Sequence, residues 1–218
     1  MTDDITTIAS GQVDAVERGL TIDEKDGAAT VVSTISQVYA TTVEDLWGAC
    51  TSAERLPRWF APVSGNLELG GRYQVEGNAG GTIESCEPPA SFRATWEFQG
   101  AVSWIAVRVE PAGDDGARLT LEHTATEEFP NDFWTTYGPG ATGVGWDLSL
   151  LGLALHLATG ADKPPEGSEW ERSDSAREFI TGSSRRWADA SVSAGTDEAA
   201  AREAEKRTTA FYTGQPAE

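Results

Sequence analysis

The period of the hydrophobic positions changes several times along the 218-residue chain. Between residues 19 and 39, short apolar runs flank the turn-forming stretch DEKDGA, which is typical of a β-hairpin. Over residues 43–50 the apolar positions recur at helical spacing, and Thr41 or Thr42 stands before them as a candidate N-cap. A second short helix is expected within residues 51–60.

Residues 64–125 carry six extended runs separated by turn-forming residues. The runs are SGNLEL, RYQVEG, GTIESCE, SFRATWEF, SWIAVRVE and ARLTLEHTA, and their separators include GG, GNAG, PPA and PAGDDG. Strands at this spacing, without helical patterns between them, predict an antiparallel meander. Residues 124–140, which follow, are expected to form a loop.

The stretch GPGATGVGWDLSLLGLALHLATG, residues 138–160, begins with a literal G-x-G-x-x-G. A dinucleotide fold needs a buried strand before those glycines and a parallel strand after the helix, and neither pattern is present. Its apolar segment covers twelve positions interrupted by polar residues, too few to cross a membrane. On a helical wheel, leucines occupy two faces, which predicts a helix buried between two layers. The glycines are expected to form the turn that leads into this helix.

The two ends of the chain differ from its middle. Residues 1–17 are polar and without periodicity, so we expect a mobile N-terminus. Residues 18–160 form the predicted folded domain. Residues 161–218 are expected to form a C-terminal helical extension, with a helix that Asp174 caps and a final helix near the end. We expect this extension to pack on its own domain, with a homodimer formed through it as the alternative.

Composition narrows the range of partners. The chain has 35 acidic and 16 basic residues, and a net charge of −19 argues against nucleic-acid and membrane partners. An acidic N-terminus without an apolar run predicts a cytoplasmic protein. Cys50 and Cys86 are interpreted as two buried thiols. With only two histidines, a histidine-rich metal site is not expected.

The order of strand, two short helices, meander and long helix resembles the helix-grip layout of the SRPBCC (START/Bet v 1-like) superfamily. The segments VYATTVEDLWGACTSAERLPRWFAP, LELGGRYQV, GTIESCEPPASFRATWEF and GVGWDLSLLGLALHL are similar to signatures of its branch named for the activator of Hsp90 ATPase. The similarity covers roughly residues 30 to 160. It implies an α+β fold in which a curved antiparallel β-sheet wraps around a long C-terminal α-helix, with two short helices after the first strand.

This resemblance implies an internal apolar cavity between the sheet and the long helix, and therefore binding of a small hydrophobic molecule. No cofactor, metal or catalytic residue is assigned. Arg108 and His123 are candidate polar groups of the cavity. The candidate apolar lining consists of Trp47, Trp59, Phe60, Trp96, Trp104, Trp146, Leu150 and Leu153.

Two other functions stay open. An acid–base enzyme of the cyclase or hydrolase kind could use His123, Glu122 or Arg108 in the same cavity. His156 is interpreted as a capping or surface residue whose charged form the helix C-terminus favours. A co-chaperone or protein-interaction module is the other alternative. Stimulation of the chaperone is not expected, because only about 30 residues precede the fold, where co-chaperones of this kind carry a separate domain.

Overall fold

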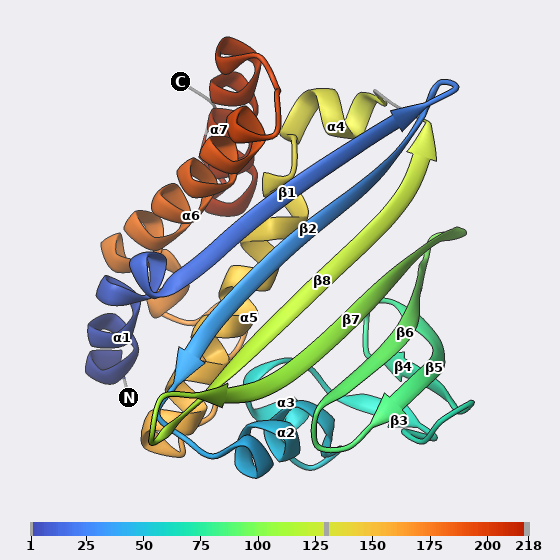
Figure 1. Cartoon of the computed structure of the whole chain (residues 1–218). Coiled ribbons are helices and arrows are strands. Elements are labelled where there is room, and N and C mark those ends of the chain that lie inside the picture. Colours follow the sequence, from blue (N-terminus) through green and yellow to red (C-terminus); the bar gives the residue numbers. More distant parts are fainter. Residues whose placement is uncertain (1, 129–130, 216–218) are drawn as a thin grey trace. The chain divides into compact units, whose positions relative to one another are not determined.

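A computed structural model of the chain describes residues 2–128 and 131–215. It confirms the α+β class, with one eight-stranded antiparallel sheet of strand order β1-β2-β8-β7-β6-β5-β4-β3 (Figure 1). The strands are β1 (Val16–Lys25), β2 (Ala28–Tyr39), β3 (Val63–Gly65), β4 (Arg72–Val75), β5 (Gly80–Glu87), β6 (Ser91–Phe98), β7 (Ala101–Ala112) and β8 (Gly116–Glu128). The helices are α1 (Thr2–Ala15), α2 (Val43–Thr51), α3 (Leu56–Trp59), α4 (Asp132–Tyr137), α5 (Gly140–Thr159), α6 (Asp174–Ser193) and α7 (Glu198–Thr213), with a 3₁₀ turn at Trp170–Arg172.

The chain divides into two compact units. The first contains Met1–Ile35, Thr126–Leu151 and Pro164–Glu218, and the second contains Ser36–Ala125 and Gly152–Lys163. The two-helix arrangement and the meander expected from the sequence fall in the second unit. Both chain ends and the helices near them fall in the first.

In the first unit, the N-terminal segment differs from the prediction. Residues 2–15 form α1, whereas the sequence suggested a segment without regular structure. Ile5, Ala9 and Gln12 are buried, and their spacing of four and three residues places them on one helix face. α1 packs against α6. Because Gln12 is polar, this face does not stand out in the hydrophobic pattern.

The glycines before the long helix differ in part from the prediction. Gly138 lies in the expected turn with a φ of 56°, but α5 begins at Gly140 and includes the later glycines. A Cβ atom at Gly143 would lie 2.3 Å from Cε2 of Trp187 on α6, and a Cβ at Gly140 would lie 3.0 Å from the hydroxyl oxygen of Thr208 on α7. Glycine therefore lets α6 and α7 approach the first half of α5 closely, at a cost in helix propensity. That low propensity is why the sequence pattern predicts a later start.

A buried ion pair links β1, α5 and α6 inside the first unit. Asp147 of α5 is completely buried, and Arg18 of β1 donates to both of its carboxylate oxygens, from Nε at 3.0 Å and from Nη2 at 2.7 Å. Ser183 Oγ and Trp187 Nε1 of α6 donate to the same carboxylate. Arg18 Nη1 also donates to the carbonyls of Val13 and Val16, so both buried charges are hydrogen-bonded, as buried charges require.

The second unit contains the predicted helix α2. Thr42 is its N-cap, and the Thr42 hydroxyl accepts a hydrogen bond from the backbone N–H of Asp45. β6, β7 and β8 pair in the regular register of a meander, with Ala94 opposite Ile105 and Ile105 opposite His123. The strand expected over SGNLEL is confined to β3, because the chain turns after Gly65 toward the left-handed Gly70.

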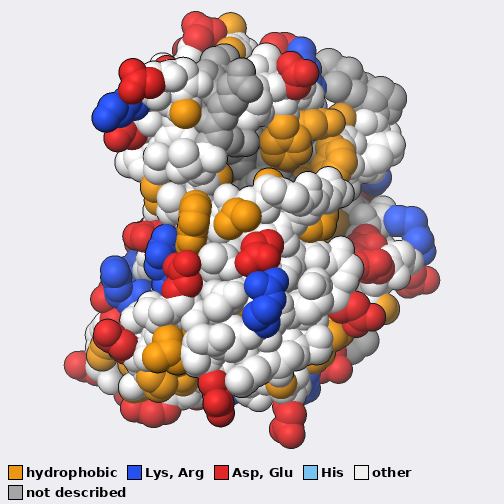
Figure 2. Space-filling model, turned by 90° about the vertical axis from the view of Figure 1, so that its right-hand side faces the viewer, with side chains coloured by type: hydrophobic (Ala, Val, Ile, Leu, Met, Phe, Trp, Pro, Cys, Tyr) orange, Lys and Arg blue, Asp and Glu red, His pale blue; other side chains and the backbone are white. Residues whose placement is uncertain are grey.

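The surface and the long helix bear on where the protein resides. Acidic side chains are spread over the face drawn in Figure 2 with basic ones among them, in keeping with the excess of 35 acidic over 16 basic residues. By length and composition, α5 could cross a membrane, but more than half of its apolar window is buried inside the protein. That burial is typical of the core helix of a soluble α+β fold.

Candidate ligand pocket

An apolar hollow of about 270 Å³ lies in the second unit. Its wall is built by α2 and α3, by the segment that follows α3, and by strands β3 to β7. The residues that line it are Trp47, Cys50, Thr51, Leu56, Phe60, Val63, Leu67, Tyr73, Val75, Ile83, Cys86, Pro88, Phe92, Ala94, Trp96 and Ile105.

Two periodicities of the sequence bring these side chains together. On α2, Trp47, Cys50 and Thr51 are three and four residues apart and share one face of the helix. On β6, Phe92, Ala94 and Trp96 are each two residues apart and share one face of the sheet. The rings of Trp47 and Phe92 meet edge to face, with their centroids 6.1 Å apart. This geometry is a favoured one for aromatic pairs and fixes both rings in the wall.

Cys50 and Tyr73 of the wall are neutral at neutral pH. Burial raises the pKa of the Cys50 thiol to about 12, so it stays protonated. Burial, and after it the nearby Glu97, raises the pKa of Tyr73 to about 12. Tyr73 donates to the carbonyl of Thr95 at 2.6 Å, and Thr51 donates to the carbonyl of Trp47 at 2.8 Å. The wall therefore offers an apolar, uncharged surface.

Three of the aromatic residues singled out in the sequence line this hollow, namely Trp47, Phe60 and Trp96. Trp59 is buried next to Phe60, with ring centroids 5.6 Å apart, and its indole N–H donates to the carbonyl of Ala49. Trp104 is placed differently. It lies on the other face of β7 from Ile105, and its ring faces the guanidinium of Arg93, 5.6 Å from the ring centroid.

The remaining apolar candidates belong to α5. Trp146, Leu150 and Leu153 are all buried, with 9%, 1% and 0% of their surfaces exposed. The residues that line the hollow come from α2, α3 and the strands rather than from this helix.

The two polar candidates lie on opposite faces of the sheet. His123 is opposite Ile105 in the register and its Nε2 is 2.8 Å from Ser103 Oγ. Its ring also meets Trp96, 6.3 Å between centroids. Arg108 is exposed and lines a shallow recess on the other face together with Glu122. The fold therefore separates His123 from the carboxylate and the guanidinium with which it could share acid–base chemistry.

Burial controls the protonation of both histidines. It lowers the pKa of His123 to about 4, which keeps the imidazole neutral at neutral pH. His156 was interpreted as a capping or surface residue, yet it is 5% exposed. Arg55 Nε donates to its Nε2 at 3.3 Å, and its Nδ1 lies 3.3 Å from the carbonyl oxygen of Ala161. Burial is the main cause that lowers the pKa of His156, and it outweighs the hydrogen bond to the Ala161 carbonyl, which acts in the opposite direction.

Several lining residues were not singled out in the sequence, among them Phe92, Tyr73 and Leu67. The alternation Phe92-Ala94-Trp96 could have identified Phe92 as a neighbour of Trp96. Leu67 lies between strands, where no periodicity marks it. Over the described ranges 2–128 and 131–215, no group of three histidine, cysteine, aspartate or glutamate side chains is arranged to hold a metal ion.

Known structures match this architecture over most of the chain. CalU16 from Micromonospora echinospora matches in its crystal structure at 29% identity, covering 81% of this chain and 98% of CalU16, with a TM-score of 0.61. Its solution NMR structure matches at 31% identity, covering 83% and 97%, with a TM-score of 0.63. EF2215 from Enterococcus faecalis, a conserved protein of unknown function, shares the fold at 13% identity over 84% of this chain and 96% of its own, with a TM-score of 0.58.

Among curated proteins, none matches the chain. The model of one family, "Activator of Hsp90 ATPase homolog 1-like protein", matches residues 40–158. This range contains α2, α3, the whole meander and nearly all of α5. A fold of this family is compatible with ligand binding and with a co-chaperone role. The matched range and the similarity to CalU16 agree with each other, and the chain belongs to the family of activator of Hsp90 ATPase homolog 1-like proteins.

Proposed function

We propose that the protein binds a small, neutral, hydrophobic molecule in the hollow of the second unit. The observation that carries this proposal is the apolar space of about 270 Å³ with an aromatic, uncharged wall. Binding pockets for small molecules range from roughly 300 to 1,000 Å³. A hollow near the lower end of that range suits a ligand of one or two rings.

The wall gives such a ligand both area and orientation. Trp47 and Phe92 are held edge to face, and Trp96 extends the aromatic surface along β6. Apolar ligand area removed from water contributes about 25 cal/mol per Å², and rigid aromatic walls lose little conformational freedom on binding. The wall hydroxyls of Thr51 and Tyr73 already donate within the protein, so the ligand needs few polar groups.

The geometry favours binding over acid–base catalysis. With a pKa of about 4, His123 is a weak base at neutral pH, and Glu122 lies on the other face of the sheet. Burial also keeps the Cys50 thiol protonated, and a protonated thiol is a poor nucleophile because the thiolate is the reactive form. Binding without turnover is the function these observations support best.

A co-chaperone role is the second candidate, because the matched family is named for activators of the Hsp90 ATPase. Measuring Hsp90 ATPase activity with and without the full chain tests it. A stimulation that persists when the hollow is blocked would favour this role over ligand binding. The cytoplasmic location and a homodimer formed through the C-terminal helices remain predictions.

Titration with 6-propionyl-2-(dimethylamino)naphthalene, a neutral two-ring probe whose emission shifts in apolar surroundings, tests ligand binding. Leu67→Trp should block the hollow, because Leu67 lines it on a segment between strands. Leu69→Trp is the matched control, since Leu69 is two residues away and 64% exposed. We expect saturable binding that weakens about tenfold or more in Leu67→Trp, equal to ~1.4 kcal/mol, and hardly changes in Leu69→Trp. Absence of saturable binding, or an equal effect of both substitutions, would contradict the proposal.

A further inference from the structure

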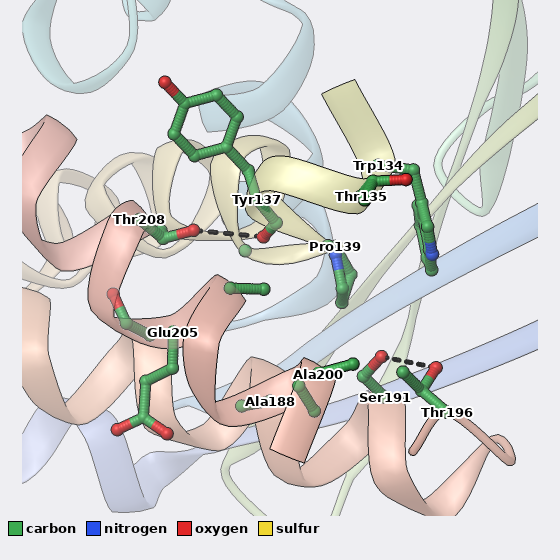
Figure 3. Close-up of a pocket in the computed structure, with 15 residues that line it drawn as sticks. Trp134, Thr135, Tyr137, Pro139, Ala188, Ser191, Thr196, Ala200, Glu205 and Thr208 are labelled. Carbon is green, nitrogen blue, oxygen red and sulfur yellow. Dashed lines mark hydrogen bonds between the residues drawn. The ribbon is translucent and has the colours of Figure 1, made fainter. Parts of the chain in front are cut away.

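A second apolar recess, of about 170 Å³, lies within the first unit between helices (Figure 3). α4 and the start of α5 form one side, where Trp134, Tyr137 and Pro139 are found. α6 and α7 form the other, with Ala188 and Ala200 facing the space. The recess shares no lining residue with the hollow of the second unit.

Small side chains leave this space unfilled. Ala188 of α6 and Ala200, Ala201 and Ala204 of α7 all line it. In cores packed to normal density, facing helices fill such a gap with larger side chains. An apolar cavity of about 150 Å³ in another protein stays dry and takes up benzene, so a space of this size is sufficient for one aromatic ring.

One hydroxyl in the wall lacks a hydrogen-bond partner. Ser184 is 1% exposed, and its Oγ bonds to no atom of the described residues. A serine inside a helix ordinarily donates to a backbone carbonyl of the preceding turn, but this one does not. Ser191 and Thr208 of the wall, by contrast, are engaged: Ser191 donates to Thr196 Oγ1 at 2.9 Å, and Thr208 donates to the carbonyl of Tyr137 at 3.0 Å. A buried hydroxyl without a partner costs about 1–3 kcal/mol, and a ligand that supplies the partner recovers part of this.

The charges around the recess select against anions. Glu205 lines it, and its carboxylate accepts a hydrogen bond from Arg202 at 3.0 Å, so that arginine is already paired. The net charge of −19 also repels anionic ligands. The favoured occupant is therefore neutral.

We propose that this recess is a second ligand site, which takes a neutral aromatic molecule of one ring carrying one oxygen that hydrogen-bonds to Ser184. The ring occupies the space left by the alanines, and the oxygen reaches the unpartnered hydroxyl. The site is independent of the hollow proposed as the main binding site.

Phenol and toluene, which differ by the hydrogen-bonding group, test this proposal on the full chain. Two-dimensional ¹H–¹⁵N NMR follows the indole N–H of Trp134 and the backbone amides of α6 and α7 during titration with each probe. We expect saturable shifts at these positions with both. In Ser184→Ala the phenol Kd should rise roughly fivefold, because one neutral hydrogen bond is lost, while the toluene Kd changes by less than about twofold.

Ser191→Ala is the matched control, because Ser191 lines the same recess on the same helix but its hydroxyl is already bonded. Its ratio of phenol to toluene affinity should equal that of the wild type. The proposal is overturned if neither probe gives saturable shifts at the recess, if Ser184→Ala leaves the phenol-to-toluene ratio unchanged, or if Ser191→Ala changes that ratio as much as Ser184→Ala. The Ser184→Ala protein should fold, since the substitution removes a buried hydroxyl that bonds to nothing described.

Discussion

Neutralising Asp147 should destabilise the first unit more than any exposed charge substitution. In Asp147→Asn the side chain keeps nearly the same volume, so no cavity opens. The charge that holds Arg18 is lost, and the arginine side chain is only 3% exposed.

The expected magnitude follows from the burial of both partners. Removing one member of a buried ion pair costs about 3–5 kcal/mol, because the other charge is left uncompensated. Part of this cost comes from the hydrogen bonds of Ser183 and Trp187, because the neutral amide oxygen of asparagine is a weaker acceptor than the carboxylate. Domains are stable by about 5–15 kcal/mol, so the loss is a large fraction of the total.

Urea unfolding followed by circular dichroism measures this loss as a change in the free energy of unfolding. Asp14→Asn is the control, because Asp14 pairs with Arg186 on the surface with 75% of its side chain exposed, and exposed pairs contribute about 1 kcal/mol or less. Replacing the pair by Arg18→Met with Asp147→Leu should recover only part of the loss, because it removes the uncompensated charge but leaves the Ser183 hydroxyl and the Trp187 N–H without their acceptor. A loss in Asp147→Asn no larger than in the control would refute this reasoning.

Three further predictions concern packing, pH and thiol chemistry. Gly143→Ala should destabilise by about 1–3 kcal/mol through its clash with the indole on α6, whereas Gly11→Ala, in a helix with open space, should stabilise slightly; thermal melts compare the two. Burial lowers the pKa of His123 from 6.5 to about 4. Between pH 6.5 and pH 4, therefore, His123 is protonated in the unfolded chain but neutral in the folded chain. Stability should therefore fall by up to about 1.4 kcal/mol per pH unit below 6.5, and less so in His123→Gln, as urea titrations at several pH values would reveal. Iodoacetamide should alkylate the half-buried Cys86 before the buried, protonated Cys50, which peptide mass mapping detects; a reversed order contradicts the assignment.

Strand and helix periodicity accounted for much of the fold. The meander, the Thr42 cap and the family were confirmed, because alternation on strands and capping chemistry are local properties of the sequence. The start of α5 was missed because it depends on a contact between residues far apart in the sequence. Gly143 lowers local helix propensity, and the reason for glycine there is the close approach of Trp187, a residue far along the chain.

The candidate site was less predictable than the fold. The sequence singled out tryptophans, and alternation can place Trp96 on one face of β6, but it cannot show which face meets the hollow. Trp104 and Arg108 lie on one face of β7, and Ile105, which lines the hollow, lies on the other face. The buried pair of Arg18 and Asp147 joins residues 129 positions apart, a partnership that no local pattern records.

Native mass spectrometry tests the central claim, ligand binding in the hollow of the second unit, most directly. Wild type, Leu67→Trp and Leu69→Trp would be incubated with an apolar cell extract and compared with their denatured masses. The account predicts one small-molecule adduct on the wild type and on Leu69→Trp, and its loss in Leu67→Trp. Bare protein in every sample, or the same adduct on Leu67→Trp, would contradict it.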